Sequence, residues 1–337
     1  MKNRISIIIP CYNVEQDIRT TLQCILMQTY TNLEVLCVND GSTDGSLQVL
    51  QEIAKSDARV KVFDKPNGGV TSARLYGLEQ ATGDWISFID GDDTIDADMY
   101  ERLLANVTAD DIDISHCGYK KIFPGGMIEY YHNTGKRVEQ DTHTGCMDLL
   151  KGETIEPGLV NKLYRKTLFD GLSDWLDISI KINEDLLMNF FLFRNSRKSV
   201  YEDFCPYHYI VRLGSASASK INENKLYDPI RVMDKLIEET IGNVGLQDIA
   251  KSRLTYLLIN GTTQIYGDKK ELVKSFRKYT LRRLRKMLKS ILKEKCYTKG
   301  RKLCALWVSV WPASYRLVHR ICVKQKYKRY KEIYPWL

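Results

Sequence analysis

Short apolar runs alternate with amphipathic stretches over the first 90 residues of the chain. Four apolar runs, each ending at a polar loop, predict buried strands at residues 5–9, 33–38, 60–63 and 85–89. Apolar positions at helical spacing predict helices at 14–25, 47–53 and 70–81, the middle one capped by Ser42 or Thr43. Strands that alternate with helices are typical of an α/β fold, so we predict a mostly parallel sheet flanked by helices.

The alternation weakens after about residue 115, where a polar stretch with two adjacent glycines begins. Helical spacing returns near 186–193, and two further helices are predicted at 223–242 and 246–266. We therefore predict an α/β domain made of two halves, followed by a helical extension and a basic tail. The boundaries of these four parts are 1–115, 116–220, 221–268 and 269–337.

Charge is distributed very unevenly along the chain. The 337 residues are 44% hydrophobic and 27% charged, a globular composition that excludes a disordered or fibrous protein. The net charge of +8 conceals a tail, residues 269–337, with 22 Lys or Arg and three acidic residues, whereas residues 1–268 have a net charge of −11. This asymmetry indicates a polyanionic partner for the tail, either nucleic acid or anionic lipid.

The cysteines and the hydropathy of the sequence indicate the cellular compartment of the protein. The nine cysteines form no Cys-x-x-Cys pair, and the first residues do not resemble a secretion signal, so we expect a reducing cytoplasm. Because no apolar run reaches the roughly 20 residues that a membrane-spanning helix needs, we expect no transmembrane span.

Acidic side chains follow two of the predicted strands directly. Asp40, Asp90 and Asp92 stand at carboxyl ends of strands, where open parallel sheets bind ligands, although acidic residues also simply form turns. Asp90 and Asp92 offer hard oxygen ligands that suit Mg²⁺ or Mn²⁺. A calcium-binding loop from Asp90 to Glu101 is the competing interpretation, but Ile95 occupies its glycine position. Neither a dinucleotide-binding glycine motif nor a P-loop occurs.

Five motifs in order identify a family. The sequence resembles family 2 glycosyltransferases over roughly residues 3–220, and these are inverting enzymes with the nucleotide-sugar-binding GT-A fold. The motifs are Ser6-Ile-Ile-Ile-Pro10-Cys-Tyr12-Asn13, Asn39-Asp40-Gly-Ser-Thr-Asp44-Gly, Asn67-Gly-Gly-Val-Thr-Ser-Ala-Arg74, Gly83-Asp-Trp-Ile-Ser-Phe-Ile-Asp90-Gly-Asp92-Asp93 and Asn183-Glu184-Asp185.

The resemblance implies a role for individual residues. It makes Asp185 the catalytic base that takes a proton from the acceptor hydroxyl, although a helix N-terminus also favours acids at this position. It makes Asp92 and Asp90 the ligands of Mn²⁺ or Mg²⁺, to which His208 adds a further ligand. The nucleotide-sugar-binding residues that it implies are Pro10, Tyr12, Asp40, Arg74, Asp90, Gly91 and Asp92. On the diphosphate or acceptor side it implies Lys162, Glu184, Arg212 and Ser215.

The function expected from this resemblance is transfer of a single sugar. The donor is a nucleoside diphosphate sugar, with UDP favoured, and the acceptor is a hydroxyl of a growing glycan in surface polysaccharide synthesis. The basic tail indicates that this glycan is lipid-linked, and a soluble acceptor stays equally open. Asn39 replaces an Asp found in many members, and the Q-x-x-R-W motif of processive synthases is missing. Two alternatives stay open: a nucleotidyltransferase that makes the nucleotide sugar, and a non-catalytic membrane-bound module of glycan assembly.

The tail favours peripheral attachment to a membrane. Apolar positions from Leu272 to Ile291 form a helical stripe among basic residues, and Trp307, Trp311 and Tyr315 follow at intervals of four. We therefore expect a cytoplasmic enzyme on the inner face of the cell membrane, held by anionic lipid. The alternative is that the stripe packs on the catalytic domain. No nucleic-acid-binding motif accompanies the charge, and the sequence does not reveal the oligomeric state.

Overall fold

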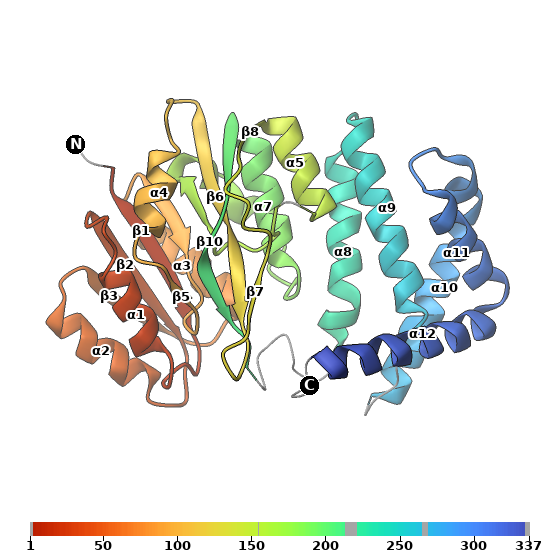
Figure 1. Ribbon diagram of the computed structural model, residues 1–337, viewed down its shortest axis with the longest axis horizontal. Helices are drawn as coiled ribbons and strands as arrows, with labels where there is room; N and C mark the ends of the chain where they lie inside the picture. The colour runs from red at the N-terminus through yellow and green to blue at the C-terminus, as the bar shows by residue number, and fades with distance from the viewer. Residues whose placement is uncertain (1–2, 154, 213–220, 265–268, 334–337) are drawn as a thin grey trace. The chain divides into compact units, whose positions relative to one another are not determined.

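The computed structural model describes residues 3–153, 155–212, 221–264 and 269–333, with side chains up to residue 322 in the last helix. The chain divides into two compact units, Met1–Ser219 and Lys220–Leu337, called the N-terminal and C-terminal units below. The N-terminal unit is a sheet with helices, and the described residues of the C-terminal unit are helical (Figure 1). The predicted α/β class is confirmed.

The N-terminal unit contains all the strands of the described residues. They are β1 (Ile5–Cys11), β2 (Leu33–Asp40), β3 (Val60–Lys65), β4 (Trp85–Phe88), β5 (Thr94–Ile95), β6 (Ile112–Ile122), β7 (Ile128–Tyr130), β8 (Arg137–Asp141), β9 (Lys162–Arg165) and β10 (Lys198–Ile210). The helices are α1 (Ile18–Leu26), α2 (Ser46–Ser56), α3 (Val70–Gln80), α4 (Met99–Ala105), α5 (Thr142–Lys151), α6 (Leu172–Trp175), α7 (Glu184–Asn195) and the 3₁₀ helix η1 (Lys166–Phe169).

The strands form one sheet in the order β3-β2-β1-β4-β9-β6-β10-β5, with β7 beside β6 and β8 beside β10. The segment β3-β2-β1-β4 is parallel, as the alternation predicted. Beyond it the sheet is mixed, because β9 runs antiparallel to both β4 and β6. The cap predicted for the second helix is wrong: Gly45 precedes α2, since Ser42 and Thr43 instead bond to Asn13 in the loop after β1.

Burial on both faces explains the continuous apolar run of β1. Ile5, Ile7 and Ile9 pack in one core cluster with residues of α1 and α2. Ile8, on the other face, meets α3 at Gly77, where an added Cβ would come within 2.5 Å of the Ile8 side chain. A larger residue at this position would push α3 off the sheet, so the glycine in the predicted helical pattern serves close packing.

The strand register brings several loops to one edge of the sheet. Cys11 of β1 is paired with Asn39 of β2, and Asp40 at the end of β2 is paired with Lys65 of β3. Ile8 of β1 is paired with Phe88, so β4 also ends toward this edge, two residues before Asp90. Polar groups at the carboxyl ends of three neighbouring strands are therefore gathered there.

The C-terminal unit consists of five described helices. They are α8 (Glu223–Glu239), α9 (Val244–Gly261), α10 (Lys270–Lys293), α11 (Lys299–Val310) and α12 (Pro312–Ile333). The first two correspond to the helices predicted at 223–242 and 246–266. Arg283 of α10 forms an ion pair with Asp234 of α8, and Gly261 of α9 lies against Thr280 of α10.

The interpretation of α10 as a lipid-facing amphipathic helix is wrong. Its apolar stripe is buried by neighbouring helices of the same unit, as Val273, Phe276, Leu284 and Ile291 have at most 3% of their surface exposed. The spacing predicts the stripe correctly but not its partner, because periodicity does not reveal what covers an apolar face.

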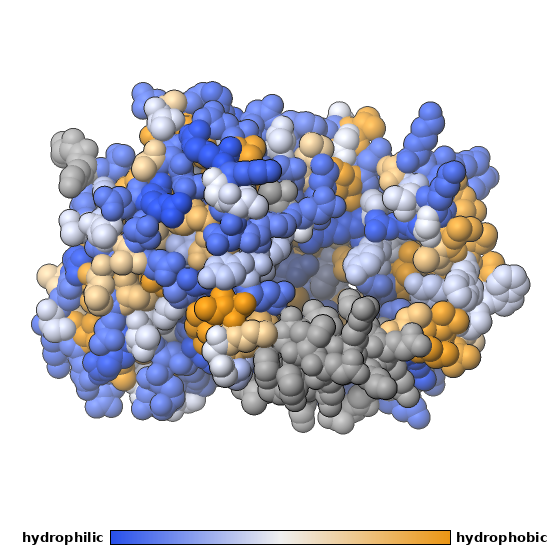
Figure 2. Space-filling model, viewed as in Figure 1, coloured by the Kyte–Doolittle hydropathy of each residue, from blue (hydrophilic) through white to orange (hydrophobic). Residues whose placement is uncertain are grey.

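Exposed apolar side chains occur instead on α11 and at the start of α12. Leu303 and Trp311 are each 67% exposed. Figure 2 shows orange, hydrophobic side chains in this part of the molecule, at the right of the view. Among the described residues, no helix combines the length and the hydropathy that crossing a bilayer requires.

Candidate functional site

Arg74 joins two parts of the sequence that are far apart. Its side chain lies on α3 and is 7% exposed. Nη2 donates to Asp90 Oδ1 at 3.0 Å, and Nη1 donates to Glu184 Oε1 at 3.4 Å. The guanidinium thus neutralises acids from the turn after β4 and from the first turn of α7. The structure brings together three of the residues that the sequence implicated.

Glu184 and Asp185 begin α7, directly after Asn183 in the left-handed conformation (φ 64°). Burial, followed by the charge of Asp185, raises the pKa of Glu184 to about 7. Burial also raises the pKa of Asp185, although the positive charge of Arg74 opposes this shift. Two adjacent acids in a shielded position next to one arginine are suited to holding or accepting a proton near neutral pH.

Arg212 pairs with Asp92, the second acid of the Asp-x-Asp turn formed by Asp90, Gly91 and Asp92. Its Nη1 lies 2.8 Å from Asp92 Oδ2 and 3.1 Å from Asp17 Oδ2. Burial, followed by the charge of Asp90, raises the pKa of Asp92. The Asp90 and Asp92 side chains are 36% and 37% exposed, so both present hard oxygen ligands at the surface. This donor set fits a divalent cation such as Mn²⁺ or Mg²⁺.

Asp93 fastens β10 to this turn. Tyr207 Oη donates to Asp93 Oδ2 at 2.6 Å, and the Ile210 backbone N–H donates to Asp93 Oδ1 at 2.9 Å. Burial, followed by the charge of Asp90, raises the pKa of Asp93 to about 8. Because Arg212 comes two residues after Ile210, this contact fixes the segment that delivers Arg212 to Asp92.

The calcium-binding interpretation of 90–101 is wrong. Thr94 and Ile95 form β5 and pair with His208 and Tyr207 of β10, and Glu101 lies in α4, where it accepts a hydrogen bond from Thr29. The ligand positions of a calcium loop are therefore spread over a strand and a helix.

His208 engages both of its ring nitrogens within the protein. Nε2 lies 2.8 Å from Asp96 Oδ1, and Nδ1 lies 3.1 Å from Thr94 Oγ1. Burial, followed by the charge of Lys120, lowers the pKa of the ring. In this arrangement His208 joins β10 to β5 and offers no ring nitrogen to a metal, so we leave it out of the ligand set proposed below.

Asp40 holds the loop that precedes α3, the helix on which Arg74 lies. Its Oδ1 accepts from Lys65 Nζ at 2.6 Å and from the Gly68 N–H at 2.9 Å, and its Oδ2 accepts from the Gly69 N–H at 2.7 Å. The side chain is only 3% exposed. Asp40 therefore fixes residues 66–69, and with them the start of α3.

The remaining nucleotide-side residues surround the end of β1. Tyr12 is 52% exposed, whereas Gly91 is buried against β1. An added Cβ at Gly91 would lie 3.3 Å from the Pro10 carbonyl oxygen, so the Asp-x-Asp turn passes close to the end of this strand. Pro10, Tyr12 and Gly91 thus lie at the same sheet edge as Asp40 and Asp90.

Lys162 is an internal cation. It is completely buried, and its Nζ donates to the carbonyls of Glu156 and Gly158 at 2.8 and 2.6 Å and to Asn161 Oδ1 at 2.7 Å. Asn189 of α7 donates to the same Gly158 carbonyl at 2.9 Å. Lys162 and Asn189 therefore clamp the loop 156–158 between β9 and α7, and Lys162 does not extend to the surface where a phosphate would meet it.

Two residues at the site, Lys65 and Asp17, escaped the sequence interpretation, and both pair with predicted site residues. Asp93, the last acid of the fourth motif and a further candidate oxygen ligand in the sequence, instead bonds to β10. The sequence did contain a signal for Lys65, because this residue ends β3, the strand next to the one that Asp40 ends. Ser215, implicated by the resemblance, lies outside the described residues.

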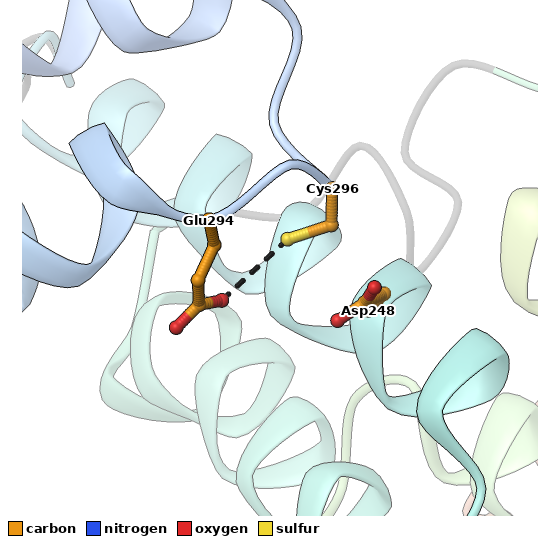
Figure 3. A group of neighbouring side chains, drawn as sticks. All are labelled: Asp248, Glu294 and Cys296. Atoms are coloured by element: carbon orange, nitrogen blue, oxygen red, sulfur yellow. Dashed lines mark hydrogen bonds between the residues drawn. The ribbon is translucent and has the colours of Figure 1, made fainter.

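A second group of possible metal ligands lies in the C-terminal unit. One ligand atom from each of Asp248, Glu294 and Cys296 lies within 4.8 Å of the others. Figure 3 shows Cys296 directed at Glu294, to which its thiol donates at 3.6 Å. Burial, followed by the charge of Asp248, raises the pKa of Cys296 to about 11. The thiol therefore holds its proton, which it donates to Glu294, and a metal would have to displace that proton to bind the sulfur.

Comparison with known proteins identifies a family for part of the sequence. Residues 6–172 match the family described as glycosyl transferase family 2. Glycosyltransferase GlyA of Streptococcus pneumoniae is 32% identical over 222 residues, 64% of this chain and 32% of that protein. The putative glycosyltransferase EpsH of Bacillus subtilis is 34% identical over 221 residues, 63% of this chain and 62% of that protein. The chain thus spans less than two thirds of each relative.

A solved structure shares the fold. Residues 1–349 of S. aureus TarS, crystallised in complex with UDP, superpose with a TM-score of 0.65 at 18% identity, covering 97% of this chain and 91% of that one. At this identity the likeness establishes the GT-A fold alone. Together with the family match over the sheet that carries Asp40, Arg74 and Asp90, it leads to one conclusion: residues 6–172, in the N-terminal unit, form a family 2 glycosyltransferase domain.

Proposed function

We propose that the chain is an inverting glycosyltransferase that moves one sugar from a nucleoside diphosphate sugar to a hydroxyl group. The observation that supports this most strongly is the acid cluster around Arg74, which assembles Asp90, Glu184 and Asp185 at one place. A glycosyl transfer needs a place for the diphosphate and a base for the acceptor, and this cluster provides candidates for both.

Asp185 is the group assigned to the proton in this proposal. Its carboxylate takes the proton from the acceptor hydroxyl as that oxygen attacks the anomeric carbon, and the diphosphate leaves from the opposite face. General base catalysis of this kind typically contributes about 10²- to 10⁴-fold. Burial raises the pKa of Asp185, which makes its carboxylate a stronger base, and the positive charge of Arg74 favours the ionised form that accepts the proton.

Asp90 and Asp92 are the ligands assigned to a divalent cation. When bound there, Mn²⁺ or Mg²⁺ supplies positive charge that stabilises the departing diphosphate. Arg212, which pairs with Asp92, lies beside the same position and adds a second positive group. Tyr12, exposed after β1, is assigned to the nucleotide base.

A UDP-sugar is the donor in this proposal. TarS, which shares the fold, has been crystallised with UDP and with UDP-GlcNAc. The acceptor is assigned as a lipid-linked glycan in surface polysaccharide synthesis, since the basic segment 269–337 favours a cytoplasmic enzyme held at the inner membrane face.

Titration calorimetry tests this proposal directly. A panel of nucleoside diphosphate sugars is titrated into the full chain with and without Mn²⁺. We expect one UDP-sugar to bind, and to bind more tightly with the metal. The same titration with the Asp92→Asn variant should lose the metal dependence. Absence of binding by every donor would contradict the assignment.

The two alternatives differ in what they would bind and release. A nucleotidyltransferase would consume a nucleoside triphosphate and a sugar phosphate, and it needs a Gly-rich basic loop after the first strand, where this chain has Pro10-Cys-Tyr-Asn13. A non-catalytic module would bind the donor without turnover. The observed Arg74-centred cluster favours the transferase over both.

A further inference from the structure

Helix α11 has two apolar faces, and only one is covered. Ala305 and Val308 are completely buried against neighbouring helices of the C-terminal unit. On another face, Leu303, Leu306, Trp307 and Val310 are 67%, 40%, 37% and 49% exposed. Their spacing is i, i+3, i+4 and i+7, the pattern of a helix face that normally packs against something.

The exposed apolar surface continues onto α12. Leu317, Val318 and Ile321 of this helix are 62%, 41% and 51% exposed, and Trp311 stands between the two helices. Trp307 links the two, because its Nε1 donates to Ser314 Oγ at 2.8 Å and its ring meets the Tyr315 ring edge-on at 5.3 Å. We call the exposed apolar residues of these helices the α11–α12 face.

The segment that carries this face is strongly basic. Residues 299–333 contain ten Lys or Arg and one acidic residue, Glu332. In the stretch whose side chains are described, 299–322, five bases and no acid occur. Two copies of this face would bring like charges together, which opposes self-association. An anionic lipid surface instead matches both properties, since it accepts apolar side chains, holds Trp at its boundary and attracts Lys and Arg.

We propose that the α11–α12 face docks the chain on an anionic membrane surface. The apolar side chains enter the boundary between headgroups and acyl chains, and the flanking bases meet lipid phosphates. The buried stripe of α10 does not take part; it holds the unit together. The α11–α12 face is thus the place where the enzyme of the proposed function is held at the membrane. Only the purpose of the docking rests on the proposed function, because docking itself needs no sugar transfer.

Co-sedimentation of the full chain with vesicles tests the docking. One set contains phosphatidylcholine with phosphatidylglycerol, and the other contains phosphatidylcholine alone. We expect pelleting with the first set, and a loss of at least about tenfold in partitioning for a Leu303→Glu, Trp311→Glu double variant. The matched control is Ile241→Glu, Val244→Glu, at positions 75% and 74% exposed in the same unit, which should partition like the parent chain.

Two further measurements separate the outcomes. The unfolding temperature and the donor titration should be the same for the double variant and the parent chain, so that failure to dock is distinct from misfolding and from failure of the proposed transferase. Equal pelleting of parent and double variant, equal pelleting with neutral vesicles, or no pelleting at all would overturn the proposal. So would a dimer in light scattering that the double variant abolishes, since it would assign the face to a second copy.

Discussion

Arg74 on α3 contacts Glu184 on α7 across 110 positions of sequence, with Nη1 and Oε1 3.4 Å apart. The same guanidinium holds Asp90 at 3.0 Å. Helix α3 rests on the parallel half of the sheet, whereas α7 lies in the chain between β9 and β10, two strands of the mixed half. This arginine therefore ties together the two halves of the N-terminal unit at the point where the chemistry is proposed to occur.

Replacement of Arg74 by Met should lower both stability and donor binding. The substitution leaves Glu184 partly buried beside Asp185 without its cation, and loss of one partner from a buried pair costs about 3 kcal/mol. Urea unfolding and donor titration measure the two effects. Arg19→Met removes an exposed pair with Glu52 and should cost less than about 1 kcal/mol, so equal losses in the two variants would contradict the role given to Arg74.

The Asp185→Asn variant should bind donor and metal like the parent chain but transfer no sugar. Asparagine keeps the shape of the side chain and cannot accept the acceptor's proton, so we expect a loss of at least about 10²-fold in kcat. Product release measures transfer, and calorimetry measures binding. Asp170→Asn makes the same change at an exposed position and should retain activity. Retained transfer by Asp185→Asn would rule it out as the base.

The pKa of Glu184 predicts a specific dependence of stability on pH. Its folded pKa is about 7, above the unfolded value near 4.3. Between these values the folded state keeps a proton that the unfolded state releases, so the contribution of Glu184 is full below about pH 4 and is lost as the pH rises through 7. Glu184→Gln removes this titration.

The free energy of unfolding of parent and Glu184→Gln chains should therefore be compared at pH 5 and pH 8. The free energy of unfolding of the variant, relative to that of the parent chain, should be higher at pH 8 than at pH 5. Glu52→Gln, an exposed acid on α2, serves as the control and should show little change in the difference. A difference that is constant with pH would mean that Glu184 is ionised throughout.

Lys162→Met should destabilise the N-terminal unit by at least about 2 kcal/mol, because three buried acceptors lose their donor. Burial lowers the pKa of Lys162 to about 8, below the unfolded value near 10.4, so the folded state releases this proton first and the stability of the parent chain relative to Lys162→Met should rise between about pH 8 and pH 10. Urea unfolding at pH 7 measures the effect. Lys55→Met, at an exposed position of α2, should be nearly neutral; a neutral Lys162→Met would instead place this lysine outside the clamp of loop 156–158.

Local patterns in the sequence determined much of the fold. Runs of β-branched residues located β1 to β4, and apolar spacing located α1 to α3, α8, α9 and α10, because each of these signals depends only on residues that are neighbours along the chain. Asp90 and Asp92 were recognisable for the same reason, as they directly follow an apolar strand. The five motifs also identified the family, since each of them is a continuous stretch of sequence.

Tertiary packing decided what no local signal contains. The spacing in α10 predicted an apolar stripe, but only the packed unit shows that neighbouring helices cover it and that the apolar residues of α11 and α12 remain exposed. The resemblance implies His208 as a metal ligand and Lys162 as a contact on the diphosphate or acceptor side, whereas their contacts with Asp96 and with loop 156–158 give both a structural role. A side chain's role depends on which groups surround it, and those groups come from distant segments brought together by the sheet.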